Sequence, residues 1–133
     1  MSNILAGIGR GQMEVLDNRI ASRRANFEFY KANLASTDIK FLQEPAGYFS
    51  NRWLTCIITK SFNQRENIRL RLEKENIEAR PLWKPMHQQP VFKNYPKYVN
   101  GIAEDLFEKG LCLPSGSNLS EDDLNRVVSA IKS

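Results

Sequence analysis

The stretch RWLTCIITK, residues 52–60, decides the fold. It is rich in β-branched and aromatic residues and is bounded by charged or polar positions, which is typical of a β-strand. Alternation would place Leu54, Cys56 and Ile58 on one face and Trp53, Thr55, Ile57 and Thr59 on the other. Because both faces carry bulky side chains, we predict a central strand that is covered at least partly on both sides.

The segments after this strand alternate between helix and strand signals. We expect helices over 64–76 and 102–109, strands over 77–80 and 111–113, and a last helix capped by Ser120. Pro81 and Pro114 end the two later strands. The order predicts a mixed α and β fold (α+β): a small, mainly antiparallel three-stranded sheet covered by helices.

Residues 3–35, which precede the sheet, predict one long helix. Apolar side chains recur at intervals of three, four and seven, and form a stripe made of Met13, Leu16, Ile20, Phe27, Tyr30 and Leu34. Gly7, Gly9 and Gly11 weaken the first turns, so we expect another backbone to pack closely against them. Their spacing does not match a dinucleotide-binding fingerprint.

Composition limits the class of protein. The chain has 133 residues, a net charge of +4, 41% hydrophobic and 26% charged residues, which fits one globular domain and argues against disorder. Cys56 and Cys112 lack metal-site spacing and are expected to be reduced thiols. No apolar run reaches the length of a membrane span, and no signal peptide is evident, so we expect a cytoplasmic protein without a membrane partner.

Residues 81–98 form a loop that is interrupted by four prolines and rich in aromatic residues. Long ordered loops often carry function. The loop holds an indole, an ammonium group, an imidazole and an amide, so Trp83, Lys84, His87 and Gln89 are the candidate ligand-binding residues. His87 is the only histidine, which excludes a two-histidine metal site.

A structural role for this loop remains an alternative. Trp83 and Tyr95 could stack on a flat or sugar-like ligand, whereas for Val91 and Phe92 we favour a role in sealing the core. Basic residues near aromatic ones also suggest RNA binding, but the helix arginines are interleaved with Glu66, Glu73 and Glu75. That pattern is typical of a solvated helix face, so we expect no nucleic-acid partner.

Three segments resemble the DegT/DnrJ/EryC1/StrS family of pyridoxal phosphate-dependent sugar aminotransferases. They are MSNILAGIG (1–9), continued by Gln12, Leu16, Asp17, Arg23 and Arg24; NIEARPLWKPMHQQP (76–90), in which residue 88 varies; and GLCLPSGSNL (110–119). The resemblance covers nearly the whole chain. It implies the C-terminal small domain of a fold-type I aminotransferase over residues 1–133, with residues 1–35 as a long inter-domain and dimer helix.

The resemblance also implies a chemistry. An intact enzyme would use pyridoxal phosphate to transfer an amino group, from glutamate, to a keto-deoxy nucleotide sugar for surface polysaccharides, and would be a homo-oligomer. The lysine that forms the Schiff base belongs to a larger N-terminal domain, which we expect this chain to lack. We therefore expect no catalytic residue, no stable cofactor binding and no activity in the chain alone. A non-catalytic interaction module, or relic, is the alternative.

Overall fold

The computed structural model describes residues 2–133, so the first residue of the MSNILAGIG segment lies outside the described part. In chain order the elements are α1 (Asn3–Glu14), α2 (Leu16–Asn33), β1 (Lys40–Phe41), β2 (Thr55–Ile58), α3 (Phe62–Lys74), β3 (Arg80–Pro81), the 3-10 turns η1 (Met86–Gln88) and η2 (Pro90–Phe92), α4 (Ile102–Lys109), β4 (Gly110–Leu113) and α5 (Glu121–Lys132). The predicted mixed α and β fold is confirmed.

The sheet has four strands in the order β1-β2-β4-β3, and every pair is antiparallel. The prediction of three strands missed β1, because two residues are too few to show an alternating pattern. β2 is central, as expected, and lies between β1 and β4. Thr55 and Ile57 are buried on one face of β2, whereas Cys56 and Ile58 are half-buried on the other.

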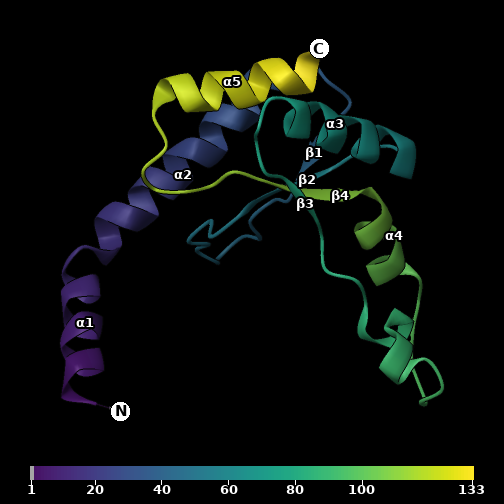
Figure 1. Cartoon of the computed structure of the whole chain (residues 1–133), viewed down its shortest axis with the longest axis horizontal. Helices are drawn as coiled ribbons and strands as arrows, with labels where there is room; N and C mark the ends of the chain where they lie inside the picture. The colour runs from purple at the N-terminus through teal and green to yellow at the C-terminus, as the bar shows by residue number, and fades with distance from the viewer. Residues whose placement is uncertain (1) are drawn as a thin grey trace.

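The core lies between the buried face of the sheet and helices α2, α3 and α5 (Figure 1). Ser120 caps α5 through a capping box with Asp123, and the apolar face of this helix is buried as the sequence predicts. Gly110 ends α4 for a reason that the sequence does not show. Its φ is −91°, but a Cβ atom there would overlap the backbone oxygen of Leu106 and the side chain of Leu82, so close packing requires glycine.

The helix expected over residues 3–35 is divided at Val15. The Val15 N–H donates to the Gln12 carbonyl at 3.3 Å, and a new helix begins at Leu16. The C-terminal half of the predicted stripe is correct, since Phe27, Tyr30 and Leu34 are buried. α1 buries no residue, and a Cβ at Gly7, Gly9 or Gly11 would meet nothing within 4 Å in the described chain.

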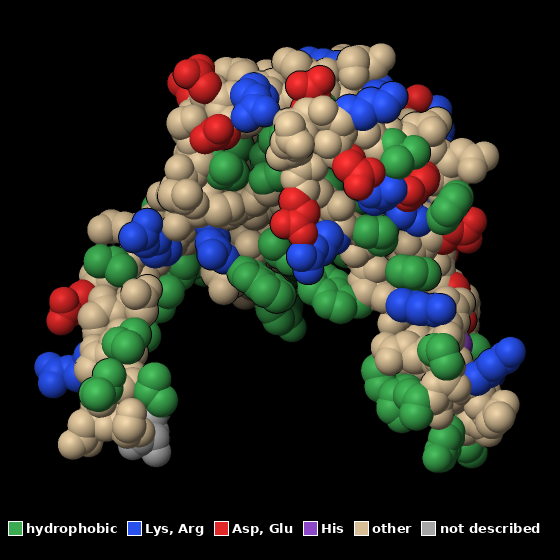
Figure 2. All heavy atoms as spheres, in the orientation of Figure 1, with side chains coloured by type: hydrophobic (Ala, Val, Ile, Leu, Met, Phe, Trp, Pro, Cys, Tyr) green, Lys and Arg blue, Asp and Glu red, His purple; other side chains and the backbone are tan. Residues whose placement is uncertain are grey.

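Two projections extend from the same side of the body: α1, and residues 82–101, here called the arm (Figure 1). Val91 is 68% exposed and Phe92 36% exposed. The expectation that these two residues seal the core is therefore wrong, because the arm extends beyond the sheet. Hydrophobic side chains gather on both projections and on the body between them (Figure 2). No helix among residues 2–133 is long and apolar enough to cross a membrane.

Candidate functional site

An apolar hollow of about 750 Å³ lies on the face of the sheet opposite α2, α3 and α5, here called the open face, and Phe107 of α4 is among the residues that line it. Trp53 and Trp83 form its rim, with ring centroids 6.1 Å apart and an interplanar angle of 29°. Both indoles are exposed, at 60% and 65%. A stacked pair of exposed indoles offers a flat apolar surface to a ring-shaped ligand or to another protein domain.

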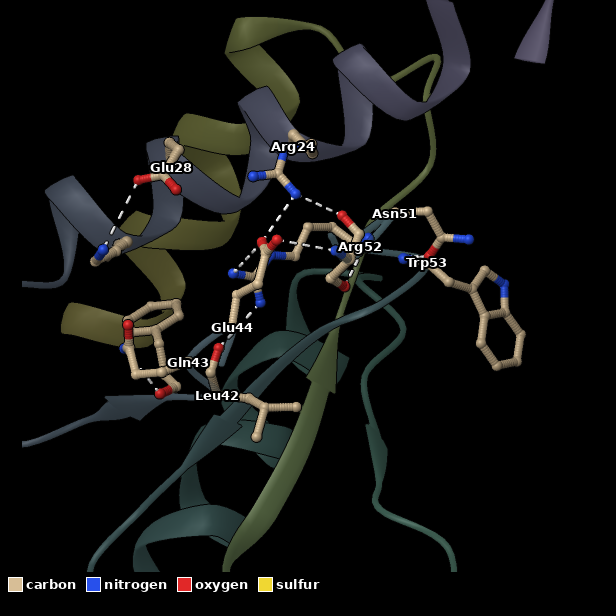
Figure 3. A network of polar contacts seen from close by, with 11 residues as sticks. Arg24, Glu28, Leu42, Gln43, Glu44, Asn51, Arg52 and Trp53 are labelled. Carbon is tan, nitrogen blue, oxygen red and sulfur yellow. Dashed lines mark hydrogen bonds and ion pairs between the residues drawn. The ribbon is translucent and has the colours of Figure 1, made fainter. Parts of the chain in front are cut away.

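The loop that carries Trp53 is held by one carboxylate. Glu44 accepts hydrogen bonds from the Ser50 N–H at 3.0 Å, from Arg24 at 2.9 Å and from Arg52 at 3.5 Å (Figure 3). Arg52 also donates to the Leu42 carbonyl at 3.0 Å. Figure 3 shows Trp53 directed away from this cluster, so the network fixes the backbone from which the indole projects.

The guanidinium of Arg52 is nearly buried, at 9% exposure, and lies 3.7 Å from the centroid of the Phe27 ring. The backbone at Arg52 has a φ of 49°, in the left-handed region that non-glycine residues rarely adopt. Arg52, which is predicted to begin the central strand, lies instead in the loop before β2.

The network makes part of the stability dependent on pH. The Ser50 N–H, followed by the Arg24 and Arg52 guanidinium groups, lowers the pKa of Glu44 despite the opposing effect of burial. The pKa of a glutamate in an unfolded chain is about 4.3. Because folding lowers the pKa of Glu44, the ionised carboxylate stabilises the fold at pH values above about 4.3. This stabilisation is lost as the pH falls through the pKa that Glu44 has in the folded protein.

Glu44→Gln is therefore expected to lower the Tm by several degrees at pH 7. The difference from the parent should shrink as pH falls below about 4, because the parent then loses the same contribution. Thermal unfolding from pH 3 to pH 7 measures this. Glu28→Gln is the matched control, since the Glu28 carboxylate is exposed and lies 4.0 Å from Lys31. A difference for Glu44→Gln that stays constant down to pH 3 would contradict the role of the carboxylate charge.

A second hollow, of about 650 Å³, lies between the arm and α4. His87 Nε2 lies 2.7 Å from Glu104 Oε1, and Lys84, Lys93 and Lys97 line the same hollow. A backbone hydrogen bond lowers the pKa of Glu104, and the contacts with His87 and Lys97 lower it further. Glu104 is thus ionised at neutral pH and can only accept, so His87 Nε2 donates. In the neutral ring Nδ1 is then free to accept a hydrogen bond.

The four predicted site residues do not form one cluster. Lys84 and His87 share the basic hollow, whereas Trp83 lies at the rim of the apolar hollow. Gln89 is half-buried, and its Nε2 lies 3.4 Å from the Lys84 carbonyl and 3.5 Å from Met86 Sδ, so it stabilises the turn. Tyr95 packs edge-on against Phe92 rather than beside Trp83.

Sequence reasoning missed Trp53 and Glu104, which are the direct partners of Trp83 and His87. Trp53 lies within the segment predicted as a strand, and Glu104 lies within the helix predicted over 102–109. Trp53 and Trp83 are 30 residues apart in the sequence, and His87 and Glu104 are 17 residues apart. A local sequence pattern does not indicate contacts over such separations. Within residues 2–133, no group of three or more histidine, cysteine, aspartate or glutamate side chains could hold a metal ion.

Comparison with known proteins identifies the family. Residues 1–132 match the DegT/DnrJ/EryC1/StrS aminotransferase family. The chain is 47% identical over 136 residues to EpsN of Bacillus subtilis, provisionally named a pyridoxal phosphate-dependent aminotransferase, and 34% identical over 132 residues to GDP-perosamine synthase of Escherichia coli O157:H7. Each alignment covers 98% of this chain and 35% of the relative, so the chain spans about a third of the length of these relatives.

Solved structures agree on the fold. The PLP form of Spr1654 from Streptococcus pneumoniae, provisionally named a sugar aminotransferase, superposes with a TM-score of 0.89 at 23% identity, over 99% of this chain and 35% of that one. PseC of Helicobacter pylori, an aminotransferase of pseudoaminic acid biosynthesis, gives a TM-score of 0.82 at 19% identity, over 93% of this chain and 34% of that one. The chain belongs to the DegT/DnrJ/EryC1/StrS aminotransferase family.

Proposed function

We propose that residues 1–133 act as the C-terminal small domain of a pyridoxal phosphate-dependent aminotransferase. The whole protein would transfer an amino group from glutamate to a keto-deoxy nucleotide sugar. Family membership supports the reaction class, and the name of the relative GDP-perosamine synthase supports a nucleotide-linked amino sugar as product. The observation that carries the proposal is the pair of hollows, the apolar one on the open face and the basic one between the arm and α4.

Both projections expose large apolar side chains, and such patches are typical of interaction surfaces. On α1 the exposed side chains are Ile4, Leu5, Ile8 and Met13, and on the arm they include Val91, Tyr95, Tyr98 and Val99. We propose that a larger, cofactor-bearing domain covers this surface. Residues 1–35 would then connect the two domains and contribute to a homo-oligomer, with the three glycines of α1 at a close backbone contact.

Pyridoxal phosphate forms a Schiff base with a lysine whose amine must lose its proton, and burial or a neighbouring cation promotes that loss. The lysines of this chain do not fit that role. All are exposed except Lys109, which is half-buried and paired with Asp105. No catalytic step is therefore assigned to residues of this chain, and we propose that the cofactor is held elsewhere in the longer protein.

The task that remains for this domain is to bind the substrate. We propose that His87 contacts the nucleotide sugar through Nδ1, which the Glu104 contact leaves free to accept from a hydroxyl group. Lys84 would supply positive charge for the diphosphate, and Trp83 an apolar surface for a ring. Gln89 would act on the substrate indirectly, by holding the turn that carries Lys84.

The proposal predicts that the isolated chain transfers no amino group. Incubation with pyridoxal phosphate followed by borohydride should label exposed lysines sparsely and without selectivity, because no lysine is buried. Peptide mass mapping of the reduced adducts, together with an assay for consumption of glutamate, measures this. One lysine labelled stoichiometrically, with turnover, would overturn the assignment of the cofactor to another part of the protein.

A further inference from the structure

Cys56 and Cys112 face each other at the centre of the sheet. They are directly opposed in the antiparallel register of β2 and β4, and both thiols are free. Their sulfur atoms lie 3.8 Å apart, close enough for one thiol to donate to the other. Neither residue has a part in the proposed substrate contacts, so this pair stands apart from the proposed function.

The backbone geometry permits a covalent bond between the two sulfurs. Opposed residues of an antiparallel pair have Cα atoms about 4.5–5.5 Å apart. Disulfides span Cα separations of roughly 4.4–6.8 Å. Closing the remaining gap between the sulfurs requires side-chain rotation and no shift of strand register.

The two thiols differ in access and in acidity. Cys56 is half-buried and lines a small hollow beside Trp53 and Trp83, whereas Cys112 is 8% exposed. The hydrogen bond from the Cys112 thiol lowers the pKa of Cys56 to about 7, against the effect of burial. The same contact, and burial, raise the pKa of Cys112. Cys56 is thus the more accessible and more nucleophilic thiol, and Cys112 is the proton donor beside it.

We propose that Cys56 and Cys112 form a reversible cross-strand disulfide when the protein meets a peroxide. The Cys56 thiolate attacks one oxygen of hydrogen peroxide, the O–O bond breaks, and water leaves after protonation, so that Cys56 becomes a sulfenic acid. The Cys112 sulfur then attacks the Cys56 sulfur. The S–O bond breaks, a second water leaves with the Cys112 proton, and the S–S bond forms. Two thiols are oxidised by two electrons and one peroxide is reduced to two waters.

The test treats the reduced chain with hydrogen peroxide and follows its intact mass and free-thiol content. The expected product is a monomer that has lost two hydrogens and both thiols, contains a peptide cross-linked between positions 56 and 112, and returns to the starting mass with dithiothreitol. The fluorescence of the nearby indoles should change during oxidation and recover on reduction, because Trp53 and Trp83 border the hollows that the two cysteines line.

Single variants separate the two roles. Cys56→Ser should lower the rate of reaction with peroxide roughly tenfold or more, because the remaining thiol is buried and mostly protonated. Cys112→Ser should still react, but should gain oxygen at Cys56 instead of forming an internal disulfide. The proposal is overturned if the parent chain accumulates oxygen at Cys56 while Cys112 stays free, if the cross-link joins two chains, or if peroxide leaves both thiols intact.

Discussion

Replacing Arg52 with alanine is expected to destabilise the fold by about 2 kcal/mol and to lower the Tm by about 10 °C. The variant loses the stacking of a nearly buried guanidinium on Phe27, the hydrogen bond to the Leu42 carbonyl and one of the two arginine partners of Glu44. Because this network holds the loop that ends at Trp53, the indole fluorescence should also shift toward that of a solvated tryptophan.

Two further variants separate the effect of the side-chain contacts of Arg52 on stability from the effect of its backbone conformation. Arg52→Gly removes the same side chain but tolerates a φ of 49°, so it should be destabilised as well if the side-chain contacts matter most. Arg10→Ala, on exposed α1, should change stability by less than about 0.5 kcal/mol. Arginine and alanine meet the same strain at this φ, so a stable Arg52→Gly would show that relief of backbone strain outweighs the loss of the network.

Replacing His87 with alanine is expected to lower turnover of the nucleotide sugar by about 10- to 100-fold in a complete enzyme, since one substrate hydrogen bond would be lost. A suitable enzyme is a chimera in which residues 1–133 replace the matching segment of the E. coli GDP-perosamine synthase. The Tm should change little, because His87 lies in the arm, outside the core, where its side-chain contact is with Glu104.

Asn94→Ala in the same chimera is the matched control. Asn94 also lies in the arm and is exposed, but it does not line the hollow of His87, so its loss should leave both turnover and Tm nearly unchanged. If His87→Ala lowered the Tm strongly while the kinetics per folded molecule stayed the same, His87 would be a packing residue. Its assignment to substrate binding would then be withdrawn.

The sequence pattern predicts a helix or strand correctly wherever one face of that helix or strand packs against the core. Alternation marks β2, and the helical period with a capping serine marks α5, because burial fixes both patterns. The helical structure predicted for residues 3–14 is present, but this helix buries no residue, because the described chain supplies no partner surface for it. The same reasoning failed for β1 because two residues carry no period.

The candidate site was predicted less completely than the fold. The motif around residues 83–89 predicts a single site in one loop, but it gives no sign that Trp83 is separated from Lys84 and His87 into two hollows. Such an arrangement depends on where the arm leaves the sheet. The network of Glu44 and Arg52 was missed because a buried charge has no signature in a hydropathy pattern, and its partners come from α2 and from the loop before β2.

We propose that this chain can serve as the small domain of a sugar-nucleotide aminotransferase. The most direct measurement is the formation of GDP-perosamine by the chimera with E. coli GDP-perosamine synthase, alongside the same exchange made with the corresponding EpsN segment. We predict product formation within about 100-fold of the parent enzyme, and none by either separated part. A chimera that folds and holds pyridoxal phosphate yet forms no product, while the EpsN exchange does, would contradict the claim.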